Sequence, residues 1–419
     1  MKDKDSESKK SEEKIDPNCI FAKENVNIGH QPEFDYLKTL GVYEILIYHI
    51  YLAFSYGYLF TLLKNIAVIL SAGCLMFLMG VGMKYSRHRE LKDYIARGVV
   101  LLTLGQYFNL IRDTLPNLIG WWVTGEKFYI SRSLLIIQTD ILTFAGWAYF
   151  FIVLLKKLKL SDFQILITSI IMNFVALPLF KIMKQPSNYI LSQFLGYFVL
   201  TNADSYFPLI GYFIFVAFGN WMGGLYQRMV NKDKFYTYIL IFLFPIVSIY
   251  HYFRCYYSIP FLPELYSVEH YCLSPGPDAI VRCMATLVFL AGFYKLHKFL
   301  GKEPYFVSHC GKNLNQYYII SFTFTTHTYA FLRLTKGTEY LNDFKYPDLL
   351  AVIASFLCRS LIDLNDKYIH FTITTLKNPM RKIVFSLIWI TTIVCLIYIY
   401  PKVEVYANIW NDYLSDSES

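Results

Sequence analysis

The chain has 419 residues, of which 55% are hydrophobic and 17% charged, and its mean hydropathy is +0.36. These values exclude a set of ordinary soluble domains and indicate an integral membrane protein built from long apolar helices. The net charge of +8 comes from short basic clusters between apolar runs, so it excludes the continuous basic stripe of a nucleic-acid-binding protein.

Along the chain, the mixed-charge segment 1–33 is predicted to be a disordered cytoplasmic tail without a signal peptide. One bundle domain is predicted over 34–400, and 401–419 forms a short polar tail. A hydrocarbon core of ~30 Å requires ~20 helical residues. Windows with this character lie at 37–54, 63–83, 98–112, 133–155, 163–180, 206–226, 236–253, 279–297, 314–332, 347–363 and 383–400. We therefore predict an all-α, polytopic integral membrane helix bundle of about ten or eleven transmembrane helices, with 114–123 and 189–200 re-entrant or interfacial.

The loops between these windows alternate in charge. One set is rich in Lys and Arg and is predicted to face the cytoplasm, while the other set is longer and poorer in basic residues and faces outward. The first span then runs from inside to outside, with a cytoplasmic N-terminus, and we expect the plasma membrane. Before the third span, KYSRHRELKDYIAR holds Arg87, Arg89, Lys92 and Arg97. This cluster either enforces topology alone or binds the phosphates of a nucleotide-containing cofactor.

Ionisable residues inside a membrane are costly, so each one is a functional hypothesis. The first span, FDYLKTLGVYEILIYHIYLAF, holds Asp35 and Lys38 at its cytoplasmic end, Glu44 near mid-depth and His49 further out. At ~1.5 Å per residue, His49 is expected about 20 Å beyond Asp35. Lys38 is either a helix-end lysine whose side chain extends to water or part of a functional site. His49 is either a core histidine hydrogen-bonded to another helix or a general base.

The fourth span carries Asp140 in LLIIQTDILTFAGWAYF, at a depth comparable with that of His49. An acid and an imidazole at one level form an oriented general-base pair, unless Asp140 only contacts a neighbouring helix. Arg112 and Asp113 end the third span on the outer side, where we interpret Arg112 as a solvated loop charge. The eight cysteines show no CxxC or Cys/His metal spacing, so we expect no metal site.

The segment FDYLKTLGVYEILIYH resembles the first-span motif of the type 3 membrane acyltransferases, in which a histidine follows a basic residue after ten intervening positions. Lys38 stands where that family has arginine, which keeps the charge but loses the planar fork. The segments CLMFLMGVGMKYSR, IIQTDILTFAG, DSYFPLIGYFIFVAFGNWMGG and GKNLNQYYIISF are similar to later landmarks of the family in the same order. The related heparan-α-glucosaminide N-acetyltransferases have a similar bundle.

The resemblance implies an enzyme that transfers an acyl group, usually acetyl, from cytoplasmic acyl-CoA to a hydroxyl or amine of a cell-envelope carbohydrate. It implies His49 as general base or acyl carrier, with Asp140, Lys38 and Asp35 completing the catalytic set. The expected donor is acetyl-CoA, without a metal, and the expected partners are a glycan and membrane lipid, with a homo-oligomer left open. The alternatives are a proton-coupled transporter or lipid-linked-sugar flippase that uses Glu44, His49 and Asp140 as a relay, and a scaffold without chemistry.

Overall fold

The computed structural model describes residues 19–54, 58–88, 90–183, 188–199, 206–257, 276–337, 340–341, 344–369 and 379–404. The predicted all-α class is confirmed, since these residues form helices and connections, with one isolated β-bridge between Phe21 and Met229. The helices are α1 (Pro32–Ala53), α2 (Tyr58–Tyr85), α3 (Leu91–Asn109), η1 (Leu110–Thr114), α4 (Leu115–Thr124), α5 (Lys127–Arg132), η2 (Ser133–Ile137), α6 (Ile141–Lys157), α7 (Asp162–Ile182), α8 (Tyr189–Gly196), α9 (Leu209–Arg228), α10 (Lys232–Tyr256), α12 (Gly276–Leu300), α13 (Tyr305–Lys312), α14 (Leu314–Lys336), α16 (Pro347–Leu364), η3 (Asn365–Ile369) and α17 (Met380–Glu404).

Six of the described helical stretches are long and apolar enough to cross a membrane. They are Leu91–Thr124, Asp162–Phe180, Leu209–Arg228, Lys232–Arg254, Gly276–Leu300 and Met380–Val403. These stretches fit an integral membrane protein. Six is fewer than the ten or eleven expected: α1 and α14 carry polar residues along their length, α6 has 17 residues, and the fully described part of α2 covers the shorter apolar stretch Ala72–Tyr85.

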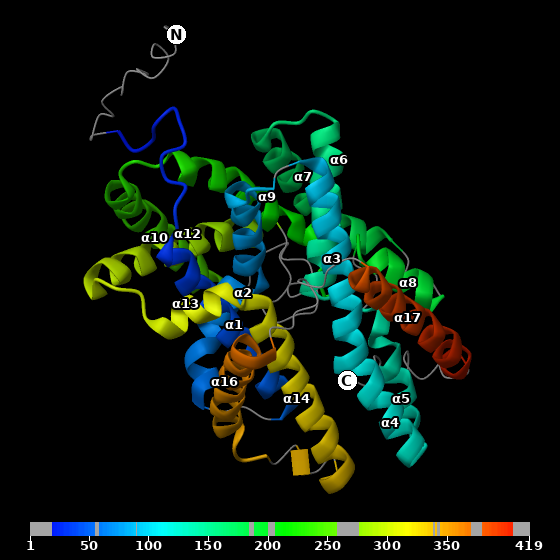
Figure 1. Ribbon diagram of the computed structural model, residues 1–419. Coiled ribbons are helices and arrows are strands. Elements are labelled where there is room, and N and C mark those ends of the chain that lie inside the picture. Colours follow the sequence, from blue (N-terminus) through cyan, green and yellow to red (C-terminus); the bar gives the residue numbers. More distant parts are fainter. Residues whose placement is uncertain are drawn as a thin grey trace, which may run out of the picture.

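Two of the apolar windows fold differently from the simple helices that we expected. The third window and the short apolar run after it form one continuous helical stretch, Leu91–Thr124, whose α3 and α4 parts are joined by the π-helical turn η1. The fourth window is interrupted, because α5 and the 3₁₀ turn η2 end before Gln138 and α6 begins only at Ile141. In Figure 1, α3 and α4 run along one side of the molecule, with α17 beside α3.

Glycines allow two helix pairs in the bundle to approach closely. A Cβ built on Gly80 of α2 would lie 2.7 Å from the backbone nitrogen of Asn220 and closer still to the carbonyl oxygen of Val216, both in α9. In the same way, a Cβ on Gly98 of α3 would lie 3.2 Å from the carbonyl oxygen of Gly146 in α6. Small residues are the usual means by which membrane helices pack backbone against backbone.

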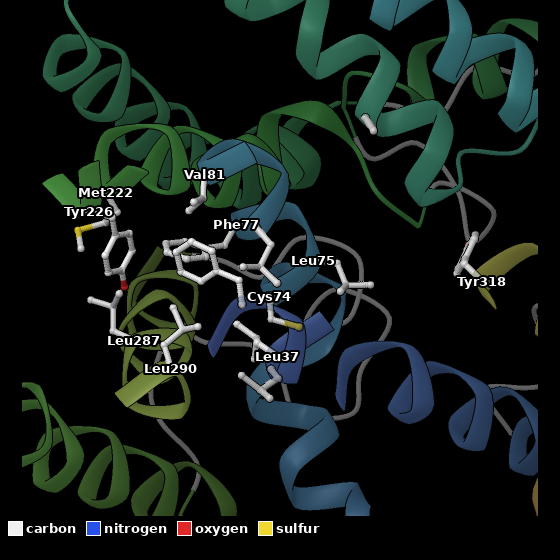
Figure 2. Packing of buried hydrophobic residues seen from close by; sticks show 14 of the residues in the cluster. Leu37, Cys74, Leu75, Phe77, Val81, Met222, Tyr226, Leu287, Leu290 and Tyr318 are labelled. Carbon is white, nitrogen blue, oxygen red and sulfur yellow. The ribbon is translucent and has the colours of Figure 1, made fainter. Parts of the chain in front are cut away.

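The largest buried apolar cluster joins eight helices around α2. Its members include Leu37 from α1, Phe77 from α2, Tyr226 from α9, Leu290 from α12 and Tyr318 from α14 (Figure 2). These side chains are almost fully buried and hold α1 against α2 and α12. The cluster thereby fixes the position of α1, the helix that carries most of the candidate site residues.

The described part of the N-terminal segment, 19–31, is bonded to the turn between α9 and α10. The backbone nitrogens of Ala22 and Val26 donate to the carbonyl oxygens of Arg228 and Gln227 at 2.7 and 2.8 Å. Where we expected a disordered tail to residue 33, the structure therefore shows ordered contacts from residue 19 onward. Residues 1–18, the first part of that expected tail, lie outside the described residues, as do 405–419 of the expected polar tail.

Candidate functional site

His49 lies in the last turns of α1 and is partly buried among aromatic rings. Its imidazole ring is 3.9 Å, centroid to centroid, from the ring of Phe322 in α14, and it also packs edge-on against Tyr48. Within the part of the chain that the structure describes, no hydrogen bond is made by the His49 ring. The interpretation of His49 as a core histidine bonded to a neighbouring helix is therefore not supported by its contacts.

Arg112 is a charged residue that contacts this aromatic group. It lies in the π-helical turn η1 and is 3% exposed. Its guanidinium carbon is 4.4 Å from the ring centroid of Phe108 and 5.0 Å from that of Phe322. Its Nε donates to Asp113 Oδ2 at 2.6 Å, and its Nη2 donates to Asn109 Oδ1 at 3.2 Å. The interpretation of Arg112 as a solvated loop charge is therefore wrong, because the helix continues past it through η1 and α4.

Asp140 lies at the interruption of the fourth window, where it caps α6. Its Oδ1 accepts hydrogen bonds from the backbone nitrogens of Leu142 and Thr143, both at 2.9 Å. Its Oδ2 is buried without a hydrogen-bond partner and lies 3.9 Å from Arg112 Nη1. The side chain is 2% exposed. One carboxylate oxygen thus satisfies the helix N-terminus, and the other faces the Arg112 guanidinium.

Phe322 and Arg112 join His49 and Asp140 into one group. The imidazole and the guanidinium both contact the Phe322 ring, and the guanidinium is paired with Asp140. We expected a direct imidazole and carboxylate pair, but the described contacts of Asp140 are with Arg112, Leu142 and Thr143. The group therefore offers an imidazole that has no hydrogen-bond partner among the described residues, near a fixed, buried positive charge. Such a charge can stabilise an anion that forms next to the imidazole.

The π-helical turn explains how Arg112 reaches this position. A π turn inserts one extra residue into an α-helix and changes which side chains face a neighbouring helix, and such turns occur often at functional sites. His327 of α14 contacts this turn, because its Nε2 lies 2.7 Å from the carbonyl oxygen of Ile111. The buried Thr114 hydroxyl also bonds to the carbonyl oxygen of Ser133 at 3.2 Å. These contacts hold η1 against α14 and η2.

Asp35 and Lys38 form a separate pair near the N-terminal end of α1. Lys38 Nζ donates to Asp35 Oδ1 at 2.8 Å and to the carbonyl oxygen of Gly311 at 3.4 Å. The Lys38 side chain is 28% exposed and that of Asp35 is 5% exposed. Gly311 of α13 packs directly on Asp35, where a side chain would collide with the carboxylate. These residues are not in contact with His49, which lies three turns further along α1.

Three of the four predicted phosphate-binding residues lie among the described residues, and all three are exposed. Arg87 and Lys92 are exposed, and Lys92 Nζ is 2.6 Å from Glu90 Oε2. Arg97 is also exposed and interacts with Tyr149 of α6. Arg89 lies outside the described residues. Within the described part of the chain, none of these three side chains contacts Lys38 or His49.

Glu44, the remaining charged residue of the first span, is buried and lies along α1 between the Asp35–Lys38 pair and His49. Its side chain is 5% exposed, and its Oε2 has no hydrogen-bond partner. No described contact connects it to His49 or Asp140. A relay through Glu44, His49 and Asp140 would therefore need groups other than these side chains to carry a proton between them.

Comparisons of the chain with protein-family models, with curated proteins and with solved structures find no match. The resemblance to the type 3 membrane acyltransferases therefore rests on the sequence segments described above.

Proposed function

We propose that this protein is a membrane-bound acyltransferase that moves an acyl group, in the first instance acetyl, from cytoplasmic acyl-CoA to a hydroxyl or amine of a cell-envelope carbohydrate. The observation that supports this best is the group formed by His49, Phe322, Arg112 and Asp140. It combines a histidine for which the described residues supply no hydrogen-bond partner with a buried cation held in place by two carboxylates. These are the requirements of general-base acyl transfer.

In this mechanism His49 accepts the proton of the attacking hydroxyl or amine. The acceptor oxygen or nitrogen forms a bond to the thioester carbon, the carbon–sulfur bond breaks, and the proton passes to the thiolate of CoA. Arg112 stabilises the negative charge on the carbonyl oxygen during attack. Asp140 holds Arg112 and caps α6, so it acts as a positioning residue. A transient acyl-His49 is the second route to the same products.

The same proposal includes the topology. Besides the six long apolar stretches, α1, α2, α6 with η2, α14 and α16 would also cross, which gives the ten or eleven spans expected from the sequence. The N-terminus would be cytoplasmic and the membrane would be the plasma membrane. Acyl-CoA would meet Lys38, Asp35 and the cluster of Arg87, Arg89, Lys92 and Arg97 on the cytoplasmic side. A glycan would meet His49 from the outer side, with lipid and a second copy as further expected partners.

The test is transfer from radiolabelled acetyl-CoA to carbohydrate in inside-out membrane vesicles that contain the protein. His49→Ala should lower transfer ~100-fold or more, because removal of a general base has this effect. Asp140→Asn should lower it less, since Arg112 keeps its bond to Asp113. The matched control is His251→Ala, which removes an imidazole from α10. Transfer by His49→Ala at the rate of the control would refute the mechanism.

A transporter remains the second candidate, because the interruption between η2 and α6 is a feature of transporter helices that bind ions or substrates at mid-depth. Buried Glu44 with its unpartnered oxygen would then carry a proton. Glu44→Gln separates the two functions. An acyltransferase should keep its transfer rate in this variant, whereas a proton-coupled transporter reconstituted in liposomes should lose proton uptake.

A further inference from the structure

Three potential metal ligands from distant parts of the sequence meet at the cytoplasmic end of α1. His30 precedes α1, Asp35 lies in its first turn, and Glu303 lies in the connection between α12 and α13. The His30 Nε2 atom is 3.1 Å from Glu303 Oε2 and 3.7 Å from Asp35 Oδ2. All three ligand atoms lie within 4.8 Å of one another.

We propose that His30, Asp35 and Glu303 bind a divalent transition-metal ion of the zinc class. Zinc takes imidazole nitrogen and carboxylate oxygen ligands at about 2.1 Å, so two ligands of a tetrahedral ion lie about 3.4 Å apart. The two distances from His30 differ from this value by about 0.3 Å. An imidazole with two carboxylates suits zinc better than magnesium or calcium, which prefer oxygen ligands alone.

The remaining carboxylate oxygens support this assignment. Asp35 Oδ1 accepts a hydrogen bond from Lys38, which orients the carboxylate so that Oδ2 faces His30. Glu303 Oε1 is buried and has no hydrogen-bond partner, so the second oxygen of this carboxylate is also free to approach an ion. His30 is 55% exposed, which gives an ion access from the cytoplasmic side.

A bound ion would connect three segments of the chain. These are the ordered N-terminal segment, the first turn of α1 and the connection before α13. Because the ion would bind the folded protein and not the unfolded chain, it would also stabilise the fold by mass action. Asp35 is shared with the proposed acyl-CoA site, but His30 and Glu303 are not, so variants of these two residues allow the two proposals to fail separately.

The experiment uses the full chain, purified in detergent without a histidine tag, stripped with EDTA and dialysed at pH 7.5 against micromolar ZnCl₂. We expect one tightly retained zinc per chain by elemental mass spectrometry, and a higher unfolding temperature with zinc than with EDTA. His30→Ala and Glu303→Gln should each lower zinc affinity by about tenfold or more. Neither substitution touches the buried core, so both variants should fold.

Two controls keep this test specific. His88→Ala and Glu126→Gln remove an exposed histidine and an exposed glutamate elsewhere, and both should retain zinc like the unaltered protein. Equal zinc retention by His30→Ala and His88→Ala would refute the site and reduce the cluster to an ion pair between protonated His30 and the two carboxylates. Equal retention of magnesium and zinc would refute the assignment to the zinc class.

Discussion

Replacement of Arg112 by methionine tests whether the buried charge group is an electrostatic unit. At 3.9 Å from Asp140 Oδ2, Arg112 Nη1 contributes about 4 kcal/mol of attraction at an effective dielectric constant of ~20. The bond to Asp113 at 2.6 Å adds to this. Removal of the cation leaves two acidic side chains with little exposure and without their partner, and loss of one member of a buried pair costs about 3–5 kcal/mol.

A double-mutant cycle makes the prediction specific. Arg112→Met should lower the unfolding temperature strongly, and Asp140→Asn should lower it less. The double variant should be more stable than the sum of the two effects predicts, because the asparagine no longer leaves an uncompensated charge. The measurement is thermal unfolding in detergent, followed by intrinsic tryptophan fluorescence.

The matched control for this cycle is Arg359→Met. Arg359 Nε lies 3.6 Å from Asp363 Oδ2, but both side chains are 44% exposed. An exposed pair contributes about 0–1 kcal/mol, so the unfolding temperature should change little. Equal destabilisation by Arg112→Met and Arg359→Met, or strictly additive effects in the cycle, would refute the interpretation of the group as an electrostatic unit.

Two further predictions concern packing and reactivity. Gly80→Ala should destabilise the protein by about 1–3 kcal/mol, because the new methyl group meets the α9 backbone. Gly82→Ala should not destabilise it, because a Cβ at Gly82 has no neighbouring atom within 4 Å. Thermal unfolding compares the two variants, and equal stability would contradict the close contact between α2 and α9. Burial raises the pKa of the Cys310 thiol to about 11. At pH 7.5 its alkylation by iodoacetamide, measured by peptide mass spectrometry, should therefore be at least ~100-fold slower than that of exposed Cys19. Comparable rates would show that Cys310 is accessible as a thiolate.

The helices could be predicted from the sequence because hydropathy reports them directly. Each predicted apolar window coincides with helical structure, from α1 in the first window to α17 in the last. Hydropathy could not show the interruption at Asp140, because the run LLIIQTDILTF remains apolar on average across it. The break depends on a local competition, in which the Asp140 carboxylate bonds the backbone nitrogens of Leu142 and Thr143 and starts a new helix.

The partners in the candidate site could not be predicted, since they come from segments far apart in the chain. Phe322, which contacts both His49 and Arg112, lies on α14, more than two hundred residues from either. Arg112 was also hidden by its position at the end of an apolar window, where a charged residue normally indicates the membrane boundary. Its burial depends on η1, and a π-helical turn has no simple signature in sequence.

The burial of Arg112, Asp113 and Asp140 is difficult to explain as a stabilising feature alone. Replacement of a buried ion pair by apolar residues is often neutral or stabilising, and within a membrane the removal of charges from water is more costly. The chain nevertheless places these groups near a histidine that has no hydrogen-bond partner in the part of the chain that the structure describes, at a π turn and beside an interrupted helix. Departures from regular helix geometry and from an apolar core that coincide at one position are expected at functional sites. Their coincidence is therefore the strongest physical support for the proposal that His49 and Arg112 form an active site.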